Sequence, residues 1–201
     1  MPLPPHDTAA VTGAILAGGN SVRMGQDKAI LRVRGMPMIR LIAETLRAVV
    51  PEVIIVVSRP DAYVQAGLRV VADLVDNRGP LGGLYTALHA SGMGSVFVLA
   101  CDTPFVTPEL IRYVMDFNSD RPASVALCGG QLHPLCALYR RTSLPAVTRH
   151  LQEGRLAMVD LLAALEATEV PITPDLPFWH DDLLANINTP ADLRRHAGPA
   201  R

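Results

Sequence analysis

A short run of small and apolar residues near the start of the chain constrains its fold more than any other stretch. Residues 13–17 (GAILA) are followed directly by Gly18 and Gly19, and two cations, Arg23 and Lys28, lie close behind. A short apolar run bounded by glycines is typical of a strand that is buried on both faces. Glycines after such a strand let successive backbone N–H groups converge on an anion. This order predicts a strand, a phosphate-binding loop and a helix.

Two common phosphate-binding motifs do not fit this stretch. A Walker A loop closes with Gly-Lys-Ser/Thr, whereas here Gln26 follows Gly25 and Ala29 follows Lys28. A dinucleotide fingerprint needs glycines at its first, third and sixth positions, and no frame over residues 13–25 provides them. A plain tight turn with solvated cations is the structural alternative. We interpret the stretch as a nucleoside triphosphate site of another kind.

Composition limits the remaining possibilities. With 201 residues, 49% of them hydrophobic, we expect a disordered lead-in over residues 1–10 and a single domain over 11–201. A net charge of −1 argues against a broad nucleic-acid surface, because such surfaces need many cations. The opening residues lack the features of a secretory signal, and no apolar run reaches membrane length, so we expect a cytoplasmic protein. Three cysteines without metal-ligand spacing indicate reduced thiols.

Strand and helix patterns alternate through the first 120 residues. A helical pattern covers residues 38–49, and Thr107-Pro108 has the composition of a helix start. The expected buried strands are residues 11–17, 53–57, 68–72 and 95–101. This alternation predicts an α/β fold with a three-layer, mostly parallel, Rossmann-like sheet and helices on both faces.

The alternation of strand and helix patterns ends after residue 120. Two short strands, 124–127 and 135–139, flank Gly129-Gly130 and predict a small antiparallel portion in the C-terminal half. Helices are then expected near residues 144–151 and 157–165, a strand over 169–172, and a last helix opened by Thr189-Pro190.

Polar residues directly after the expected strands are the candidates for chemistry, since ligands of open α/β sheets bind outside the carboxyl ends of the strands. Asp102 follows a strongly apolar strand and is our candidate ligand for Mg²⁺, which prefers hard oxygens; Asn188 is a candidate second ligand. Asp73 and a second glycine loop, residues 79–83, share the same expected edge. A turn-forming role is the alternative for Asp73, Asp102 and Asn188.

His133-Pro134 lies close to Cys136 and raises the alternatives of a zinc site or a Cys-His nucleophile. We disfavour both, because no third ligand stands at a useful spacing and the apolar neighbours suit a packed histidine.

Five motifs, in order, resemble the molybdenum cofactor guanylyltransferase family of nucleotidyltransferases. They are residues 16–28 (LAGGNSVRMGQDK), 79–83 (GPLGG), 101–105 (CDTPF), 133–139 (HPLCALY) and 186–190 (NINTP). The resemblance implies transfer of GMP from GTP to the terminal phosphate of molybdenum-molybdopterin, which gives the guanine dinucleotide cofactor and pyrophosphate. On metabolic grounds, cofactor-insertion proteins or acceptor molybdoenzymes are candidate partners, although no sequence motif indicates a surface for them.

The resemblance also assigns roles to residues. Arg23, Lys28 and Asp102 are the implied catalytic residues: Asp102 holds magnesium, and the two cations stabilise the departing pyrophosphate. The implied nucleotide-binding residues are Leu16, Ala17, Gly18, Gly19, Lys28, Asp73, Pro80, Leu81, Gly82 and Asp102. Residues 80–83 are expected against the guanine. One departure concerns a nucleotide-contacting Asn of the family, whose place is taken here by Val56 or Ser58.

Two other functions remain open at this point. One is a cytidylyltransferase that acts on the same pterin or on another phosphorylated metabolite. The other is a non-catalytic protein that binds the nucleotide or delivers the cofactor, although the presence of Arg23, Lys28 and Asp102 argues against it.

Overall fold

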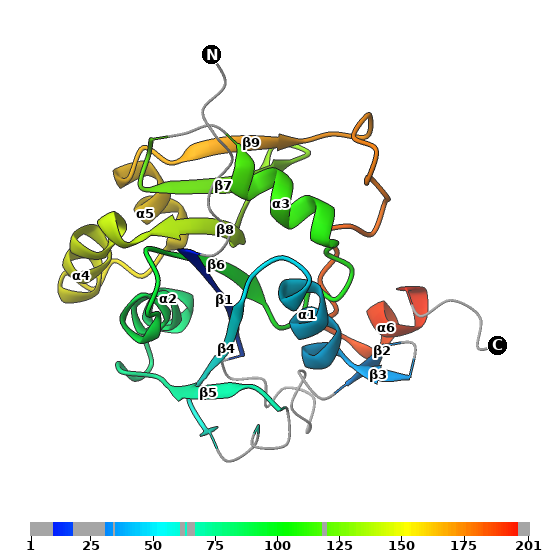
Figure 1. Cartoon of the computed structure of the whole chain (residues 1–201), viewed down its shortest axis with the longest axis horizontal. Helices are drawn as coiled ribbons and strands as arrows, with labels where there is room; N and C mark the ends of the chain where they lie inside the picture. Colours follow the sequence, from blue (N-terminus) through cyan, green and yellow to red (C-terminus); the bar gives the residue numbers. More distant parts are fainter. Residues whose placement is uncertain are drawn as a thin grey trace.

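A seven-stranded sheet in the order β5-β4-β1-β6-β8-β7-β9 forms the centre of the structure (Figure 1). The computed structural model describes residues 10–17, 31–33, 35–60, 63, 67–117 and 120–196. The strands of this sheet are β1 (Val11–Leu16), β4 (Glu52–Val57), β5 (Arg69–Ala72), β6 (Ser95–Ala100), β7 (Ala123–Cys128), β8 (Gln131–Arg140) and β9 (Thr168–Ile172). A separate two-stranded sheet contains β2 (Arg32–Val33) and β3 (Met36–Pro37).

Strand directions confirm the expected sheet. β5, β4, β1 and β6 are mutually parallel, β8 is antiparallel to both β6 and β7, and β9 is parallel to β7. All of β1 and the middle of β6 are buried, which explains why these strands are continuously apolar in sequence. The small antiparallel portion therefore consists of the pairs that β8 makes.

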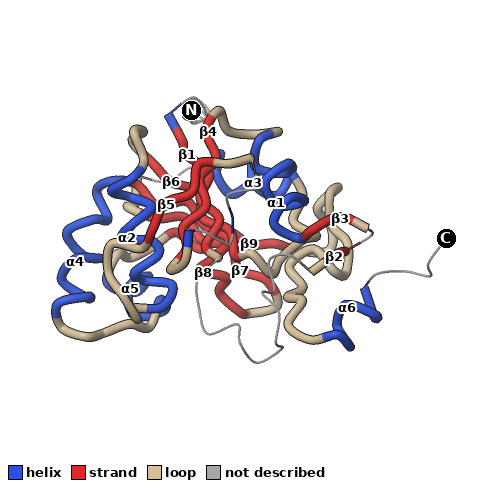
Figure 2. The backbone as a smooth tube through the Cα atoms, turned by 90° about the horizontal axis from the view of Figure 1, so that it is seen from below, coloured by secondary structure: helices blue, strands red, loops and turns tan. Residues whose placement is uncertain are grey.

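Helices cover both faces of the sheet, so the molecule has three layers. Figure 2 shows α2 (Gly79–Ala90), α4 (Leu144–Gln152) and α5 (Met158–Ala164) on one side and α1 (Met38–Arg47) and α3 (Pro108–Asp116) on the other. Each face has its own apolar core. One contains Ile42 of α1 and Leu110 of α3, and the other contains Leu84 of α2 and Leu161 of α5.

The chain after β9 returns to the carboxyl edge of the parallel strands. It ends its described course in α6 (Pro190–His196), which lies beside the β2–β3 hairpin (Figure 1). Ile187, just before α6, is fully buried with Val33 and Met38 in a small third core. Thr189 accepts a hydrogen bond from the Asp192 N–H at 3.1 Å, so the helix begins where the sequence predicts.

One local prediction was wrong. Residues 79–83 form the first turn of α2, not a loop. The physical reason is positional: Pro80 occupies the first turn of a helix, where its missing N–H costs nothing, and two of the glycines are needed for close packing there.

Every helix in the described part of the chain is too short or too polar to span a lipid bilayer.

Candidate nucleotide site

The strand order reverses between β1 and β6, and this reversal marks the candidate site. β4 pairs with one side of β1 and β6 with the other, and the helices that connect these strands lie on opposite faces. Leu16 at the end of β1 lies opposite Ala100 at the end of β6. In open α/β sheets, ligands bind in the crevice that such a reversal leaves at the carboxyl ends of the strands.

The backbone at the end of β1 is held from both sides of that crevice. The Ala17 N–H donates to the Val56 carbonyl at 3.0 Å, and the Leu16 carbonyl accepts from the Cys101 N–H at 3.2 Å. Leu16 and Ala17, two predicted nucleotide contacts, therefore stand at the reversal point. The predicted Gly18, Gly19, Arg23 and Lys28 lie outside the described residues.

Asp102 and Asn188 are brought to the same edge although they are distant in sequence. The Ile187 N–H donates to the Asp102 carbonyl at 2.8 Å, which holds the residue next to Asn188 against the end of β6. The Thr103 hydroxyl donates to the Ala100 carbonyl at 3.0 Å and closes the turn that carries Asp102. A separate hydrogen bond holds the turn at Asn188: the Asn188 N–H donates to Oδ2 of Asp192 at 3.1 Å.

The side chains of Asp102 and Asn188 would offer one carboxylate and one amide oxygen at this edge. Both are hard oxygen donors, and Mg²⁺ in nucleotide sites takes few protein ligands, keeping waters and binding phosphate oxygens. In the described part of the chain, no three His, Cys, Asp or Glu side chains cluster in a way that would hold a metal by themselves. The two donors thus fit a shared protein–nucleotide Mg²⁺ site better than an all-protein one.

Asp73 combines burial with a missing partner. Its N–H donates to the Val57 carbonyl at 2.9 Å, but its Oδ1 is buried without a hydrogen-bond partner among the described residues. Burial, and then the nearby Asp76 carboxylate, raise the pKa of Asp73. A buried oxygen without a partner costs stability, so a hydrogen-bond donor at this position would stabilise the protein.

Thr86 ties the Asp73 turn to α2. Its hydroxyl accepts from the Leu74 N–H and donates to the Gly82 carbonyl, both at 3.0 Å. A Cβ on Gly82 would lie 2.9 Å from the Cβ of Arg78, and one on Gly83 would lie 3.1 Å from Cδ1 of Leu16. The glycines therefore let the start of α2 pack against both the Asp73 turn and the end of β1.

Two further predicted nucleotide contacts belong to this first turn of α2. Pro80 is exposed, whereas the Leu81 side chain is fully buried in the core beneath the helix. Any contact between Leu81 and a nucleotide must therefore use its backbone.

Side-chain exposure distinguishes Val56 from Ser58, the two residues considered for the place of the nucleotide-contacting Asn of the family. Val56 is 1% exposed and belongs to the core on the α2 side, whereas Ser58 is exposed directly after β4. Of these two residues, Ser58 is the one whose side chain is available at the carboxyl edge.

The burial of Cys136 and His133 bears on the two alternatives for this pair, a zinc site and a Cys-His nucleophile. Cys136 is buried, and desolvation raises the pKa of its thiol to about 12, which suits an inert thiol and not a nucleophile. His133 is half-buried, and burial lowers its pKa. A zinc or Cys-His site has no support in this arrangement.

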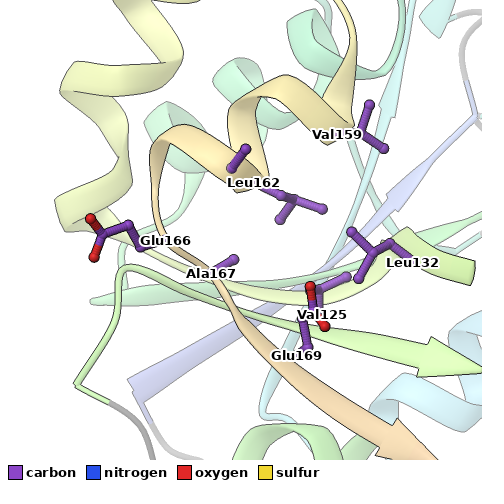
Figure 3. Close-up of a pocket in the computed structure, with 8 residues that line it drawn as sticks. Val125, Leu132, Val159, Leu162, Glu166, Ala167 and Glu169 are labelled. Carbon is purple, nitrogen blue, oxygen red and sulfur yellow. The ribbon is translucent and has the colours of Figure 1, made fainter. Parts of the chain in front are cut away.

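A groove of about 220 Å³ lies elsewhere, between α5 and the far end of the sheet. Figure 3 shows Val159 and Leu162 of α5 above Leu132 of β8 and Val125 of β7. This groove has no signal in the sequence, because its lining residues come from separate strands and one helix. The residues that line it are Val125, Leu132, Val159, Leu162, Ala163, Glu166, Ala167 and Glu169.

Comparisons with known proteins show which family the chain is similar to. Residues 13–170 match the model of the MobA-like NTP transferase domain. The chain is 39% identical to a probable molybdenum cofactor guanylyltransferase of Pelotomaculum thermopropionicum, with 90% of this chain and 89% of the relative covered. It is 33% identical to the molybdenum cofactor guanylyltransferase of Desulfosudis oleivorans, over 92% and 94% of the two chains.

Among solved structures, the crystal structure of molybdopterin-guanine dinucleotide biosynthesis protein A from Archaeoglobus fulgidus superposes with a TM-score of 0.77. It is 25% identical and covers 92% of this chain and 96% of its own.

Proposed function

Because this chain belongs to the MobA-like NTP transferase family, we propose that it transfers GMP from GTP to the terminal phosphate of molybdenum-molybdopterin and releases pyrophosphate. The observation that carries this proposal is the match to relatives named molybdenum cofactor guanylyltransferase over about nine-tenths of the chain. The crevice between β1 and β6 supports it, because the match includes the strand ends that form this crevice.

The reaction needs positioning and charge more than covalent chemistry. An oxygen of the acceptor's terminal phosphate attacks the α-phosphorus of GTP, and the bond from that phosphorus to the bridging oxygen of the β-phosphate breaks. The electron pair leaves with pyrophosphate, so no protein nucleophile is required. Holding the two substrates in line and stabilising the developing charge then account for catalysis.

Different residues of this chain position the substrates and stabilise the developing charge. Leu16 and Ala17, followed by Gly18 and Gly19, present backbone to the triphosphate, while Arg23 and Lys28 stabilise the departing pyrophosphate. Asp102 and Asn188 would hold Mg²⁺, which supplies positive charge beside the α-phosphate when bound.

Asp73 and the start of α2 belong to the GTP-binding part of the same site. The oxygen of Asp73 that has no partner among the described residues would accept a hydrogen bond from a donor group of the nucleotide. Ser58, exposed on the neighbouring strand end, is the candidate to replace the family Asn.

Pyrophosphate release, measured separately with GTP, CTP and ATP and with molybdenum-loaded pterin as acceptor, tests the function. We expect release with GTP that depends on the acceptor. A clear preference for CTP would replace the proposal with the cytidylyltransferase alternative. Tight binding of GTP without release would support a non-catalytic protein instead. A cytoplasmic location and protein partners among cofactor-insertion proteins or molybdoenzymes stay predictions.

A further inference from the structure

His133 has no role in the nucleotide site, yet the fold brings it to the same edge of the sheet. β8 is antiparallel to β6, so the first residues of β8 lie at the carboxyl end of β6. Cys136 lies opposite Leu99, one residue before the end of β6. Residues 133–135 therefore continue past the end of β6, in the direction of Asp102.

A bulge sets where His133 sits. Along β7, Val125 lies opposite Ala137 and Ala126 lies opposite His133, so residues 134–136 have no partner on β7. Pro134 suits such a position because it has no backbone N–H to donate to a neighbouring strand. The hydroxyl of the buried Tyr139 donates to the Pro134 carbonyl at 2.9 Å and fixes the bulge. Bulges commonly re-aim a side chain near an active site.

The register also gives the face on which His133 lies. Residues directly opposite each other on paired strands share a face, and Ala126 belongs to the core on the α1 and α3 side. Cys101, the residue before Asp102, packs against that same core. His133 is half-buried there, and burial lowers its pKa, which favours the neutral imidazole. A neutral imidazole offers one N–H donor and one acceptor nitrogen.

The in-line geometry of the displacement indicates which of the two substrates would lie near His133. The acceptor must approach the α-phosphorus from the side opposite to the departing pyrophosphate. Of the predicted nucleotide residues, Leu16 ends β1 and Asp73 follows β5, both on one side of β6 in the sheet, while β8 lies on the other side. The start of β8 therefore lies on the side of β6 away from these predicted nucleotide residues, which is the side left for the second substrate if the displacement is in line.

We propose that the side chain of His133 forms hydrogen bonds to the uncharged heterocycle of the acceptor, which binds on the β8 side of β6. This inference rests on the proposed function. A heterocycle that carries both donors and acceptors matches the two ring nitrogens of a neutral imidazole, whereas the acceptor's phosphate would be served better by a cation.

His133→Ala and His133→Asn test the proposal in steady-state assays that vary one substrate at a time. For His133→Ala we expect the KM for the pterin acceptor to rise about tenfold, as for one lost hydrogen bond to a ligand, with the KM for GTP within about twofold of wild type. His133→Asn should recover part of the loss, because its amide offers a donor and an acceptor. Gln131→Ala, exposed on the same hairpin, is the matched control and should change neither KM.

An unchanged acceptor KM in His133→Ala, or an equal rise in both KM values, would overturn the inference; the second result would indicate a structural role. Direct binding of the molybdenum-loaded pterin, followed by its own fluorescence without GTP, separates this inference from the proposed function. We expect about tenfold weaker binding by His133→Ala. If wild type binds the pterin but releases no pyrophosphate, the proposed function fails while this comparison still decides the role of His133.

Discussion

The N–H of Ile187 donates a hydrogen bond to the carbonyl oxygen of Asp102, with 2.8 Å between nitrogen and oxygen. This bond joins the last described segment of the chain to the turn after β6. Because Asn188 follows Ile187, its side chain originates beside Asp102. Ile187 is also fully buried, so both a hydrogen bond and apolar packing hold this contact.

Asn188→Ala should raise the Mg²⁺ concentration for half-maximal turnover by about tenfold, because one oxygen ligand is lost while the carboxylate remains. The measurement is a magnesium titration of pyrophosphate release. Asn186→Ala, exposed two residues earlier, should leave the titration unchanged. Equal magnesium requirements of Asn188→Ala and wild type would remove Asn188 from the proposed metal site.

Asp102→Ala should lower turnover by a factor of about 10² to 10³ without unfolding the chain, as expected when charge stabilisation in the transition state is lost. Asp116→Ala at the end of α3 removes an exposed carboxylate and serves as the control. Single-turnover rates and circular dichroism measure activity and fold. Near-normal turnover in Asp102→Ala would contradict the assigned role, and the same holds for Lys28→Ala, for which we expect a similar loss.

Asp73→Asn should stabilise the unliganded protein while weakening GTP binding. Burial and Asp76 raise the pKa of folded Asp73 above its usual 3.8, so the folded state binds this proton more tightly than the unfolded chain does. That contribution to stability is present at low pH and is lost as pH rises through the raised pKa. At pH 7 the variant should gain at most about 1 kcal/mol, because a neutral amide replaces a partly desolvated carboxylate whose cost solvent already reduces.

Thermal melts between pH 4 and pH 7 check this prediction, and the advantage of Asp73→Asn should shrink toward pH 4. Asp76→Asn is the paired variant: it removes the repulsion but keeps the Asp73 carboxylate, so a smaller gain with GTP binding retained is expected. A loss of stability in Asp73→Asn at pH 7 would show that Asp73 is satisfied without ligand.

Gly82→Ala should destabilise the protein by about 1–3 kcal/mol, because its Cβ would meet the Cβ of Arg78 at 2.9 Å and Cγ2 of Val75 at 3.2 Å. The Cβ of Arg78 is fixed to the backbone, so the turn must move. Gly83→Ala should cost less, since it meets the rotatable end of Leu16. Gly92→Ala has open space and should be neutral in denaturant melts. Equal costs at residues 82 and 92 would contradict this packing.

Iodoacetamide at pH 8 should modify Cys101 and Cys128 in the folded protein well before Cys136. The buried Cys136 thiol has a pKa of about 12, so very little thiolate is present. Cys101 and Cys128 are partly exposed, although burial also raises the pKa of Cys128. Peptide mass spectrometry over time gives the order, and guanidinium should make all three react alike. Early labelling of Cys136 would disprove its burial.

Local signals in the sequence predicted much of the fold. Thr107-Pro108 was identified as a helix start because an N-cap hydroxyl and an N1 proline act within one turn, and the Thr107 hydroxyl does accept from the Leu110 N–H. The parallel strands were found because burial on both faces leaves a continuous apolar run. The direction of the β7–β8 pair was predicted from its glycine turn.

Features that depend on distant partners were not predictable in the same way. The local signals of Pro80 and Gly82 resemble chain breaks and so predict a loop. Pro80 instead lies in the first turn of α2, and Gly82 is explained by its close approach to Arg78 and Val75. The bulge before Cys136 depends on the register with β7, and the Ile187–Asp102 bond joins two separate segments. The strand-end position of Asp102 was predictable, but not what lies beside it.

The contact between Ile187 and Asp102 also has a consequence for protein synthesis. A ribosome makes the chain from its N-terminus, so all seven strands of the main sheet have been translated once Ile172 is added. The residues that lie against Asp102 emerge only afterwards. In a nascent chain the nucleotide edge therefore stays incomplete until the segment that carries Ile187 has been added, and the same segment brings Leu183 to the core on the α1 and α3 side.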